Sequence, residues 1–169
     1  MQNNEIVRAL ETVATLMEIK DEAYYRVLGY TRAAESVAAL GRPVTEVDDL
    51  KTLPHVGATT AEVIRDLAED RTPQLLAELT AEIPEGLVEI TRLPSVGPRT
   101  VGRLWKELGI TSVEELAAVD PERISSLKGF GKKSAQKMVQ AARTYNATDR
   151  CLLLRHAVGG CAGIATGGC

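Results

Sequence analysis

The chain has 169 residues, of which 44% are hydrophobic and 25% are charged, a composition typical of a globular protein rather than a disordered one. Its formal net charge is −3, so no overall positive field attracts nucleic acid, and any affinity for DNA must be local. The first 50 residues contain neither a signal-peptide pattern nor a run of about 18 apolar residues, which predicts a cytoplasmic protein without membrane contact.

Helices are predicted for most of the first half. Aromatic residues make up only 4% of the chain, and Ala, Leu and Glu are abundant, which favours an all-α fold. Apolar residues recur at helical spacing over residues 4–17 and 24–40, and a Gly-Arg-Pro sequence ends the second of these helices. A short helix over 45–51 and a longer one from Thr59 or Thr60 to residue 69 follow. Thr72-Pro73 is a typical start for a further helix, which Pro84 ends.

The second half is predicted to hold two helical units in tandem. A helix over 85–91 precedes a turn, Pro98 suits the first position of the next helix, and Gly109 ends it. Ser112 begins a capping-box pattern for a helix to residue 118, Asp120 caps another that runs to 127, and the last predicted helix covers 132–145. We place a boundary near residues 82–85, which gives a first subdomain of residues 1–82 and a second of residues 83–148.

The last segment, residues 149–169, departs from this pattern. Its glycine-rich runs have no periodicity, so we expect a disordered tail. Cys151, Cys161 and Cys169 have neither CxxC spacing nor a neighbouring His cluster, so we expect no metal site. The repeated Gly-Gly-Cys sequence leaves a thiol-bearing tail as an alternative.

One short phrase occurs three times, as LPHVG at 53–57, LPSVG at 93–97 and LKGFG at 127–131. Each is followed by Ser or Thr three residues after its last glycine and then by aliphatic residues at helical spacing. Each unit is therefore predicted to be a short helix, a hairpin and a longer helix. A glycine before a helix lets the backbone approach a ligand, and the first N–H groups of the helix form an anion site. The alternative is a simple helix–helix turn with a buried Leu and Val.

The charges that follow the hairpins rank them as phosphate sites. Acidic residues follow the first hairpin, whereas Arg and Lys follow the second and third. Some of these cations stand at helix starts, where the helix dipole disfavours a positive charge unless an anion binds between the cation and the helix N-terminus. The predicted phosphate-binding residues are Gly57, Thr59, Thr60, Ser95, Gly97, Arg99, Thr100, Arg103, Gly129, Gly131, Lys132, Lys133 and Lys137.

Three other side chains in or near the hairpins are interpreted as structural. Phe130 is expected to be the apolar plug that Val56 and Val96 provide in the other hairpins, and Trp105 is expected to be partly buried. His55 stands at a turn position where glycine is usual, which argues against close approach of a phosphate to the first hairpin.

This order of motifs resembles the N-terminal part of the X-family DNA polymerases, especially the bacterial and archaeal type. The resemblance covers about residues 4–150 and is carried by residues 30–34, 53–61, 83–87, 93–104 and 129–133. It implies helix-hairpin-helix motifs that bind DNA without sequence preference, in gap filling or base-excision repair. The first subdomain would hold the 5′-phosphate side of a gap and the second the duplex. The expected partners are gapped or duplex DNA and other repair proteins, and we expect a monomer.

The resemblance also implies particular binding residues. Arg26, Tyr30 and Lys51 match positions that line the family's 5′-phosphate pocket. Hairpins of this family bind Na⁺ or K⁺ through backbone carbonyls, and no other cofactor is expected. The implied carbonyls are those of Lys51, Leu53 and Val56 in the first hairpin and of Thr91, Leu93 and Val96 in the second.

Catalysis is not expected from this chain. The carboxylates that hold two magnesium ions in the family's palm subdomain have no counterpart here, and Val63 occupies the position of the family's Schiff-base lysine. One alternative is a 5′-deoxyribose phosphate or abasic-site lyase that uses Lys51 or Lys20 instead. Another is a helical module that binds a protein partner.

Overall fold

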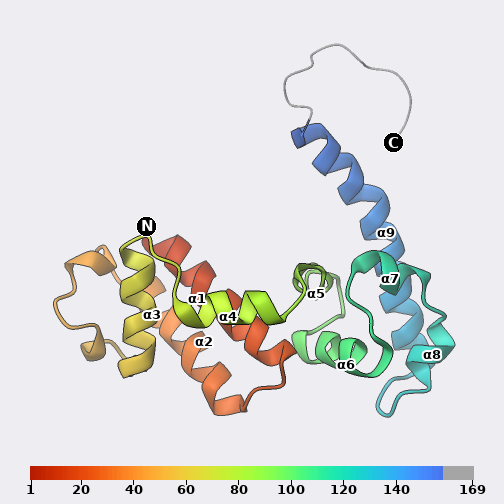
Figure 1. Cartoon of the computed structure of the whole chain (residues 1–169), viewed down its shortest axis with the longest axis horizontal. Coiled ribbons are helices and arrows are strands. Elements are labelled where there is room, and N and C mark those ends of the chain that lie inside the picture. Colours follow the sequence, from red (N-terminus) through yellow and green to blue (C-terminus); the bar gives the residue numbers. More distant parts are fainter. Residues whose placement is uncertain (158–169) are drawn as a thin grey trace.

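The computed structural model describes the backbone of residues 1–157 and the side chains of residues 1–145. Within residues 1–157 all regular elements are helices, which confirms the all-α prediction (Figure 1). In chain order they are α1 (Asn3–Ile19), α2 (Tyr24–Ala38), the 3-10 turns η1 (Val44–Glu46) and η2 (Leu50–Thr52), α3 (Ala58–Ala68), α4 (Gln74–Glu82), α5 (Glu85–Thr91), α6 (Pro98–Leu108), α7 (Val113–Ala118), α8 (Pro121–Ser125) and α9 (Lys132–Ala157).

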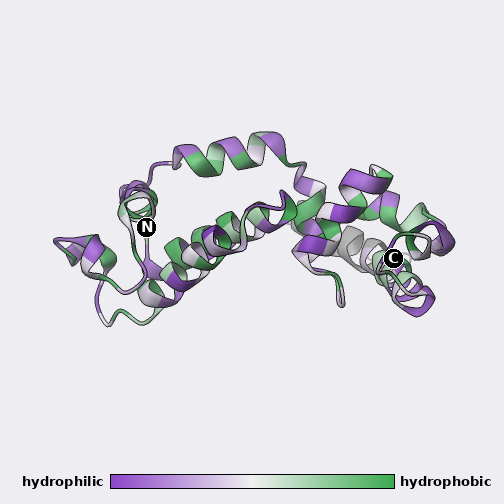
Figure 2. Cartoon of the chain, turned by 90° about the horizontal axis from the view of Figure 1, so that it is seen from below, coloured by the Kyte–Doolittle hydropathy of each residue, from purple (hydrophilic) through white to green (hydrophobic). Residues whose placement is uncertain are grey.

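Helix α1 is the centre of the packing. Ile6, Leu10, Val13 and Met17 form a buried apolar stripe at helical spacing. Helix α2 packs along α1, and α3, α4, α5 and α6 also contact it. Each fully buried aliphatic side chain of this stripe stabilises the fold by about 1.5–3 kcal/mol relative to exposure. Apolar and polar residues alternate along the helices in Figure 2, as expected of amphipathic helices.

The segment before the first hairpin differs from its prediction. Instead of one helix over 45–51, the chain forms two separate 3-10 turns, η1 and η2. The Asp49 carboxylate accepts a hydrogen bond from the Lys51 N–H at 3.0 Å and caps η2. An Asp side chain that bonds to nearby backbone in this way competes with the helical hydrogen-bond pattern, which explains the break.

The start of α4 also differs from its prediction. Pro73 has an extended ψ of 140° and precedes the helix, which begins at Gln74, and Thr72 does not cap it through its side chain. The residues between α4 and α5, Ile83 and Pro84, coincide with the predicted boundary.

In the second half the predicted helix ends are largely confirmed. Helices α5 and α6 have the predicted bounds, and Gly109 ends α6 with a φ of +70°. Ser112 caps α7 by accepting a hydrogen bond from the Glu115 N–H at 3.1 Å, and Asp120 caps α8 by accepting one from the Glu122 N–H at 3.0 Å. Helix α8 ends at Ser125 rather than at residue 127.

The last helix is longer than predicted. Helix α9 continues past Tyr145 to Ala157, so the tail that was predicted to be disordered from residue 149 begins as helix, and the prediction is wrong for residues 149–157. The helix continues because strong helix formers, among them three consecutive leucines, follow residue 150 and no Pro or Gly intervenes before residue 159. The remaining prediction for the tail concerns residues 158–169, which lie outside the described part of the chain, as do Cys161 and Cys169.

The second hairpin is packed against the first subdomain. Gly102, in the middle of α6, lies against the backbone of Ile19 at the end of α1, and a Cβ at this position would collide with the Ile19 carbonyl oxygen. In Figure 1, α5 and α6 lie between the first four helices at one end of the molecule and α7–α9 at the other. The buried apolar residues of all these helices form one cluster. No helix in residues 1–157 is both long enough and apolar enough to cross a lipid bilayer.

Candidate nucleic-acid interface

The three repeated phrases form the same hairpin. In each, the N–H of the fourth residue donates to the carbonyl oxygen of the first, and the carbonyl of the closing glycine accepts the first hydrogen bond of the following helix. The hairpin bonds are Val56 to Leu53 at 3.2 Å, Val96 to Leu93 at 3.3 Å and Phe130 to Leu127 at 3.1 Å. The helix bonds are Ala61 to Gly57 at 2.9 Å, Val101 to Gly97 at 3.0 Å and Ala135 to Gly131 at 3.0 Å.

The third residue of each hairpin has the same unusual conformation. The φ angles are +62° at His55, +66° at Ser95 and +91° at Gly129. A left-handed conformation costs a residue with a Cβ about 1–2 kcal/mol, which is why glycine is usual here. His55 nevertheless adopts the conformation that the turn requires, so it does not alter the path of the first hairpin.

Each hairpin ends at the N-terminus of a helix of at least 11 residues, namely α3, α6 and α9. Gly57, Gly97 and Gly131, which precede these helices, are exposed. The first N–H groups of a helix have no intrahelical partner, and the helix dipole adds partial positive charge there. The backbone therefore offers three exposed anion sites, of which the one at α6 has one donor fewer because Pro98 has no N–H.

Charge separates the first of these sites from the others. Residues 1–82 contain 15 acidic and 8 basic residues, a net charge of −7, whereas residues 83–148 contain 7 acidic and 10 basic residues, a net charge of +3. Exposed Glu62 lies in the second turn of α3, after the first hairpin, and exposed Glu69 follows the end of this helix. On charge alone, the first hairpin is therefore less favourable for a phosphate group than the second and third.

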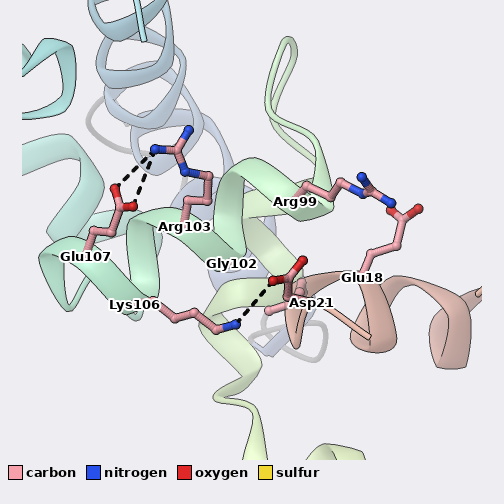
Figure 3. Close-up of a pocket in the computed structure, with 8 residues that line it drawn as sticks. Glu18, Asp21, Arg99, Gly102, Arg103, Lys106 and Glu107 are labelled. Atoms are coloured by element: carbon pink, nitrogen blue, oxygen red, sulfur yellow. Dashed lines mark hydrogen bonds and ion pairs between the residues drawn. The ribbon is translucent and has the colours of Figure 1, made fainter. Parts of the chain in front are cut away.

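Two exposed cations of α6 extend toward the first subdomain. Lys106 donates to the carbonyl oxygen of Lys20 at 3.2 Å, and its Nζ lies 4.0 Å from a carboxylate oxygen of Asp21. The guanidinium of Arg99 lies 5.7 Å from the ring centroid of Tyr24 and extends toward Glu18 (Figure 3). These side chains surround a cavity of about 400 Å³, lined by Glu18, Ile19, Asp21, Arg99, Gly102, Arg103, Lys106 and Glu107. The periodicity of the sequence gave no sign of these contacts.

Arg103, on the same helix, faces the third hairpin. Its guanidinium lies 4.8 Å from the ring centroid of Phe130, and its Nη2 lies 3.4 Å from the Glu107 carboxylate. Val56 and Val96 are 7% and 5% exposed, but Phe130 is only partly buried. The prediction that Phe130 would plug its hairpin is therefore only partly confirmed, because its ring packs against the core on one side and Arg103 covers part of it. Trp105 is partly buried, as predicted.

The third hairpin carries a group of four cations without side-chain partners among residues 1–145. Lys128, Lys132, Lys133 and Lys137 are exposed, and within the described residues none of their side chains makes a hydrogen bond or an ion pair. Lys133 and Lys137 line a shallow groove on α9 together with Gln136 and Gln140. Arg143, further along α9, instead donates through its Nε to the Ala117 carbonyl at 3.1 Å and ties α9 to α7.

The residues of the implied 5′-phosphate pocket lie on two elements, Arg26 and Tyr30 on α2 and Lys51 in η2. Ser36 Oγ donates to the Pro54 carbonyl at 2.6 Å, so the first hairpin meets α2 about 15 Å along the helix axis from Arg26. Arg26 forms an ion pair with Glu22 at 2.7 Å, and Tyr30 is 6% exposed. Burial raises the pKa of Tyr30, although the nearby Arg26 charge opposes the shift. Lys51, in η2, is exposed.

The structure offers no support for a Schiff-base nucleophile. Val63 is 5% exposed and belongs to the core. Lys20 Nζ lies 2.6 Å from the Glu82 carboxylate, and this hydrogen bond raises the pKa of Lys20. A Schiff base requires a neutral amine, so the pKa of Lys20 is shifted in the wrong direction for that chemistry. Within the described residues there is no group of three His, Cys, Asp or Glu side chains that could hold a metal ion.

Comparison with known protein families agrees with this geometry. Residues 1–73 match the family model of the helix-hairpin-helix domain, and residues 87–144 match that of the SAM-like helix-hairpin-helix tandem. The chain is built from helix-hairpin-helix domains. The helix-hairpin-helix tandem corresponds to the second and third hairpins, which carry the cations.

Individual relatives of this helix-hairpin-helix chain include DNA polymerases. The chain is 36% identical over 142 residues to the DNA polymerase/3′-5′ exonuclease PolX of Bacillus subtilis. This aligned region covers 83% of the chain and 25% of that protein. It is 28% identical over 130 residues to the DNA nucleotidylexotransferase of Gallus gallus, or 76% of the chain and 25% of that protein. A shorter match, 46% identical over 55 residues, covers 32% of the chain and 17% of the DNA repair and recombination protein RadA of Aeropyrum pernix.

The resemblance to the X-family DNA polymerases is thereby confirmed. The chain spans about a quarter of the length of the two polymerase-type relatives that it matches over most of its own length.

Proposed function

We propose that this helix-hairpin-helix chain binds DNA through the sugar-phosphate backbone without reading its sequence, as part of gap filling or base-excision repair. The observation that carries the proposal is the third hairpin, where four exposed lysines without acidic partners among the described residues surround the exposed N-terminus of α9. Backbone N–H groups and lysines together favour a phosphate group, and contacts of this kind position a protein without specifying a base sequence.

The second hairpin supplies the other contact in this proposal. Gly97 is exposed, the N–H groups of Arg99 and Thr100 have no intrahelical acceptor, and exposed Arg99 lies at the start of α6. Arg99 would have to turn from Tyr24 toward a bound phosphate. The names of the relatives support a DNA ligand, because they include DNA polymerases and a DNA repair protein.

Fluorescence anisotropy of a labelled duplex at several salt concentrations tests the proposal. If about four phosphates are neutralised, the logarithm of the binding constant should fall with the logarithm of salt concentration with a slope of about −3 to −4. The dissociation constant should be on the order of 10⁻⁴–10⁻⁶ M at physiological salt. The Lys133→Ala variant should weaken binding and reduce the slope by about 0.9. Arg8→Ala removes the same charge from α1, away from the hairpins, and should leave binding unchanged. A slope near zero for the wild type contradicts the proposal.

The same titration with a one-nucleotide gap, with and without a 5′-phosphate, examines the first hairpin. Since Arg26 is paired with Glu22 and acidic residues follow the hairpin, we expect similar affinities for both gapped substrates. Markedly tighter binding of the phosphorylated gap would show that the first subdomain recognises the 5′-phosphate after all.

A monovalent cation at the second hairpin would assist phosphate binding. Thr91 is the last residue of α5, so its carbonyl oxygen has no intrahelical donor. The Leu93 carbonyl oxygen accepts the hairpin hydrogen bond with one lone pair and has a second lone pair available. These oxygens, with that of Val96, suit Na⁺ or K⁺. Replacing K⁺ with a bulky organic cation at constant ionic strength should lower DNA affinity and shift the amide resonances of residues 91–97. Unchanged resonances would exclude the cation.

A further inference from the structure

Arg103 links the second and third hairpins. Its guanidinium lies between Glu107 on its own helix and the ring of Phe130, and the position that a Cβ on Gly129 would occupy is 3.4 Å from its Nη1. Gly129 has a φ of +91° and no side chain, so the guanidinium can lie directly against the tip of the third hairpin. An Arg side chain over an aromatic ring is attracted by the ring electrons.

This link adds to the core contacts between two parts of the second half. The third hairpin and α9 pack mainly on α7 and α8, whereas α6 packs on α1 and α5. Within the described residues, α6 and α9 themselves have at most slight backbone contact. The relative placement of the two anion sites, at the starts of α6 and α9, therefore depends on the shared core, on the contact of α5 with α7, and on the stack of Arg103 on Phe130.

We propose that Arg103 is a positioning residue that fixes the third hairpin relative to α6 and thereby favours double-stranded over single-stranded DNA. The inference rests on the proposed function. In a rigid duplex the phosphates have fixed spacing, so two anion sites bind it best when they are already held at the matching separation. A single strand is flexible and adapts to either arrangement. Arg103 was predicted to be a phosphate ligand, but its guanidinium already has two partners on the protein.

The experiment compares duplex and single-stranded affinities of four proteins across a salt series. Arg103→Ala removes the cation, and Phe130→Val replaces the ring with the residue type that occupies this position in the other hairpins. Both variants, and the double variant, should lower the ratio of duplex to single-stranded affinity by about two- to tenfold. Because both single variants break the same contact, the double variant should be no worse than either one.

The salt slope distinguishes positioning from phosphate binding. Phe130→Val changes no charge, and Arg103→Ala should keep the wild-type slope if no phosphate contact is lost. Lys133→Ala is the matched control, since it should reduce the salt slope by about 0.9 and weaken the binding of duplex and single-stranded DNA by similar factors. The inference is overturned if Arg103→Ala behaves like Lys133→Ala, or if Phe130→Val leaves the affinity ratio unchanged.

A measurement without DNA separates this inference from the proposed function. Residual dipolar couplings report the relative orientation of α6 and α9, and circular dichroism shows whether each variant remains folded. We expect the orientation to change or broaden in Phe130→Val. If the wild type binds no DNA, the proposed function fails, and the same couplings still decide the positioning role: an unchanged orientation overturns it.

Discussion

The Nζ of Lys106 on α6 donates a hydrogen bond to the main-chain carbonyl of Lys20 at the end of α1, 86 residues earlier in the chain. The contact fastens the second hairpin to the first subdomain beside the acidic residues Glu18 and Asp21 (Figure 3). These carboxylates lower the positive potential around Lys106 and Arg99, on the helix that is proposed to receive a phosphate.

Neutralising Asp21 should therefore strengthen DNA binding. Asp21 has a φ of +65°, a conformation that Asn also tolerates, so Asp21→Asn preserves the backbone. We expect the affinity to rise about two- to fivefold at low salt and the gain to disappear at high salt. Asp70→Asn is the control, because Asp70 has a φ of +56° and lies after α3, away from α6. An equal gain in both variants would show that net charge, not the position of Asp21, is responsible.

Substitution of Gly102 should destabilise the fold. A Cβ at this position collides with the Ile19 carbonyl, so Gly102→Ala should lower the free energy of unfolding by about 1–3 kcal/mol in urea titrations. Gly29 in α2 has no atom within 4 Å of the corresponding Cβ position, and Gly29→Ala should stabilise the protein by about 0.5–1 kcal/mol. The opposite signs of the two changes are the test, and a neutral Gly102→Ala would mean that α6 does not pack closely on α1.

The third residue of each hairpin has a left-handed backbone conformation, which predicts opposite changes in stability for two further substitutions. Ser95→Gly should be neutral or stabilise the protein by up to about 1 kcal/mol. Glycine relieves the backbone strain of a Cβ-bearing residue at a φ of +66°, and this gain offsets the entropy cost of glycine in the unfolded chain. Gly129→Ala should destabilise by about 1–2 kcal/mol, since φ is +91° there. Thermal unfolding of both variants gives the comparison, and equal stability of the two would contradict the proposed backbone strain.

Burial of Tyr30 predicts a loss of stability at alkaline pH. The pKa of its phenol is raised above the usual value of 10.0, mainly because burial disfavours the phenolate. The folded state then holds this proton more tightly than the unfolded state, so the stabilisation is complete below about pH 10 and declines as pH rises toward the folded pKa. Urea titrations between pH 8 and about 11 should show the wild type losing stability relative to Tyr30→Phe. Parallel pH profiles would disprove this role.

Local chemistry made most of the fold predictable from sequence. Pro98, Gly109, Ser112 and Asp120 mark helix ends by backbone restriction or by side-chain capping, and the structure has those ends. The error over residues 45–51 also has a local origin, because an Asp is favourable both in a helix start and in a cap that interrupts it.

The candidate site was less predictable because its side chains have distant partners. The hairpins and their lysines follow from spacing and charge, but sequence periodicity does not show that Arg99 meets Tyr24 or that Arg103 meets Phe130. One usable signal was present. Glycine inside a helix costs about 1 kcal/mol relative to alanine, so Gly102 in the middle of α6 indicated a close approach by another part of the backbone.

The unequal charges of the two halves give the molecule a large electric dipole along its length. At physiological ionic strength the Debye length is about 8 Å, whereas α1 alone is about 25 Å long. A DNA strand close to the α9 end therefore experiences little of the negative charge carried by α1–α4 at the opposite end (Figure 1). The net negative charge does not prevent encounter with DNA; it makes encounters depend on orientation, so that approaches with the third hairpin leading are the productive ones.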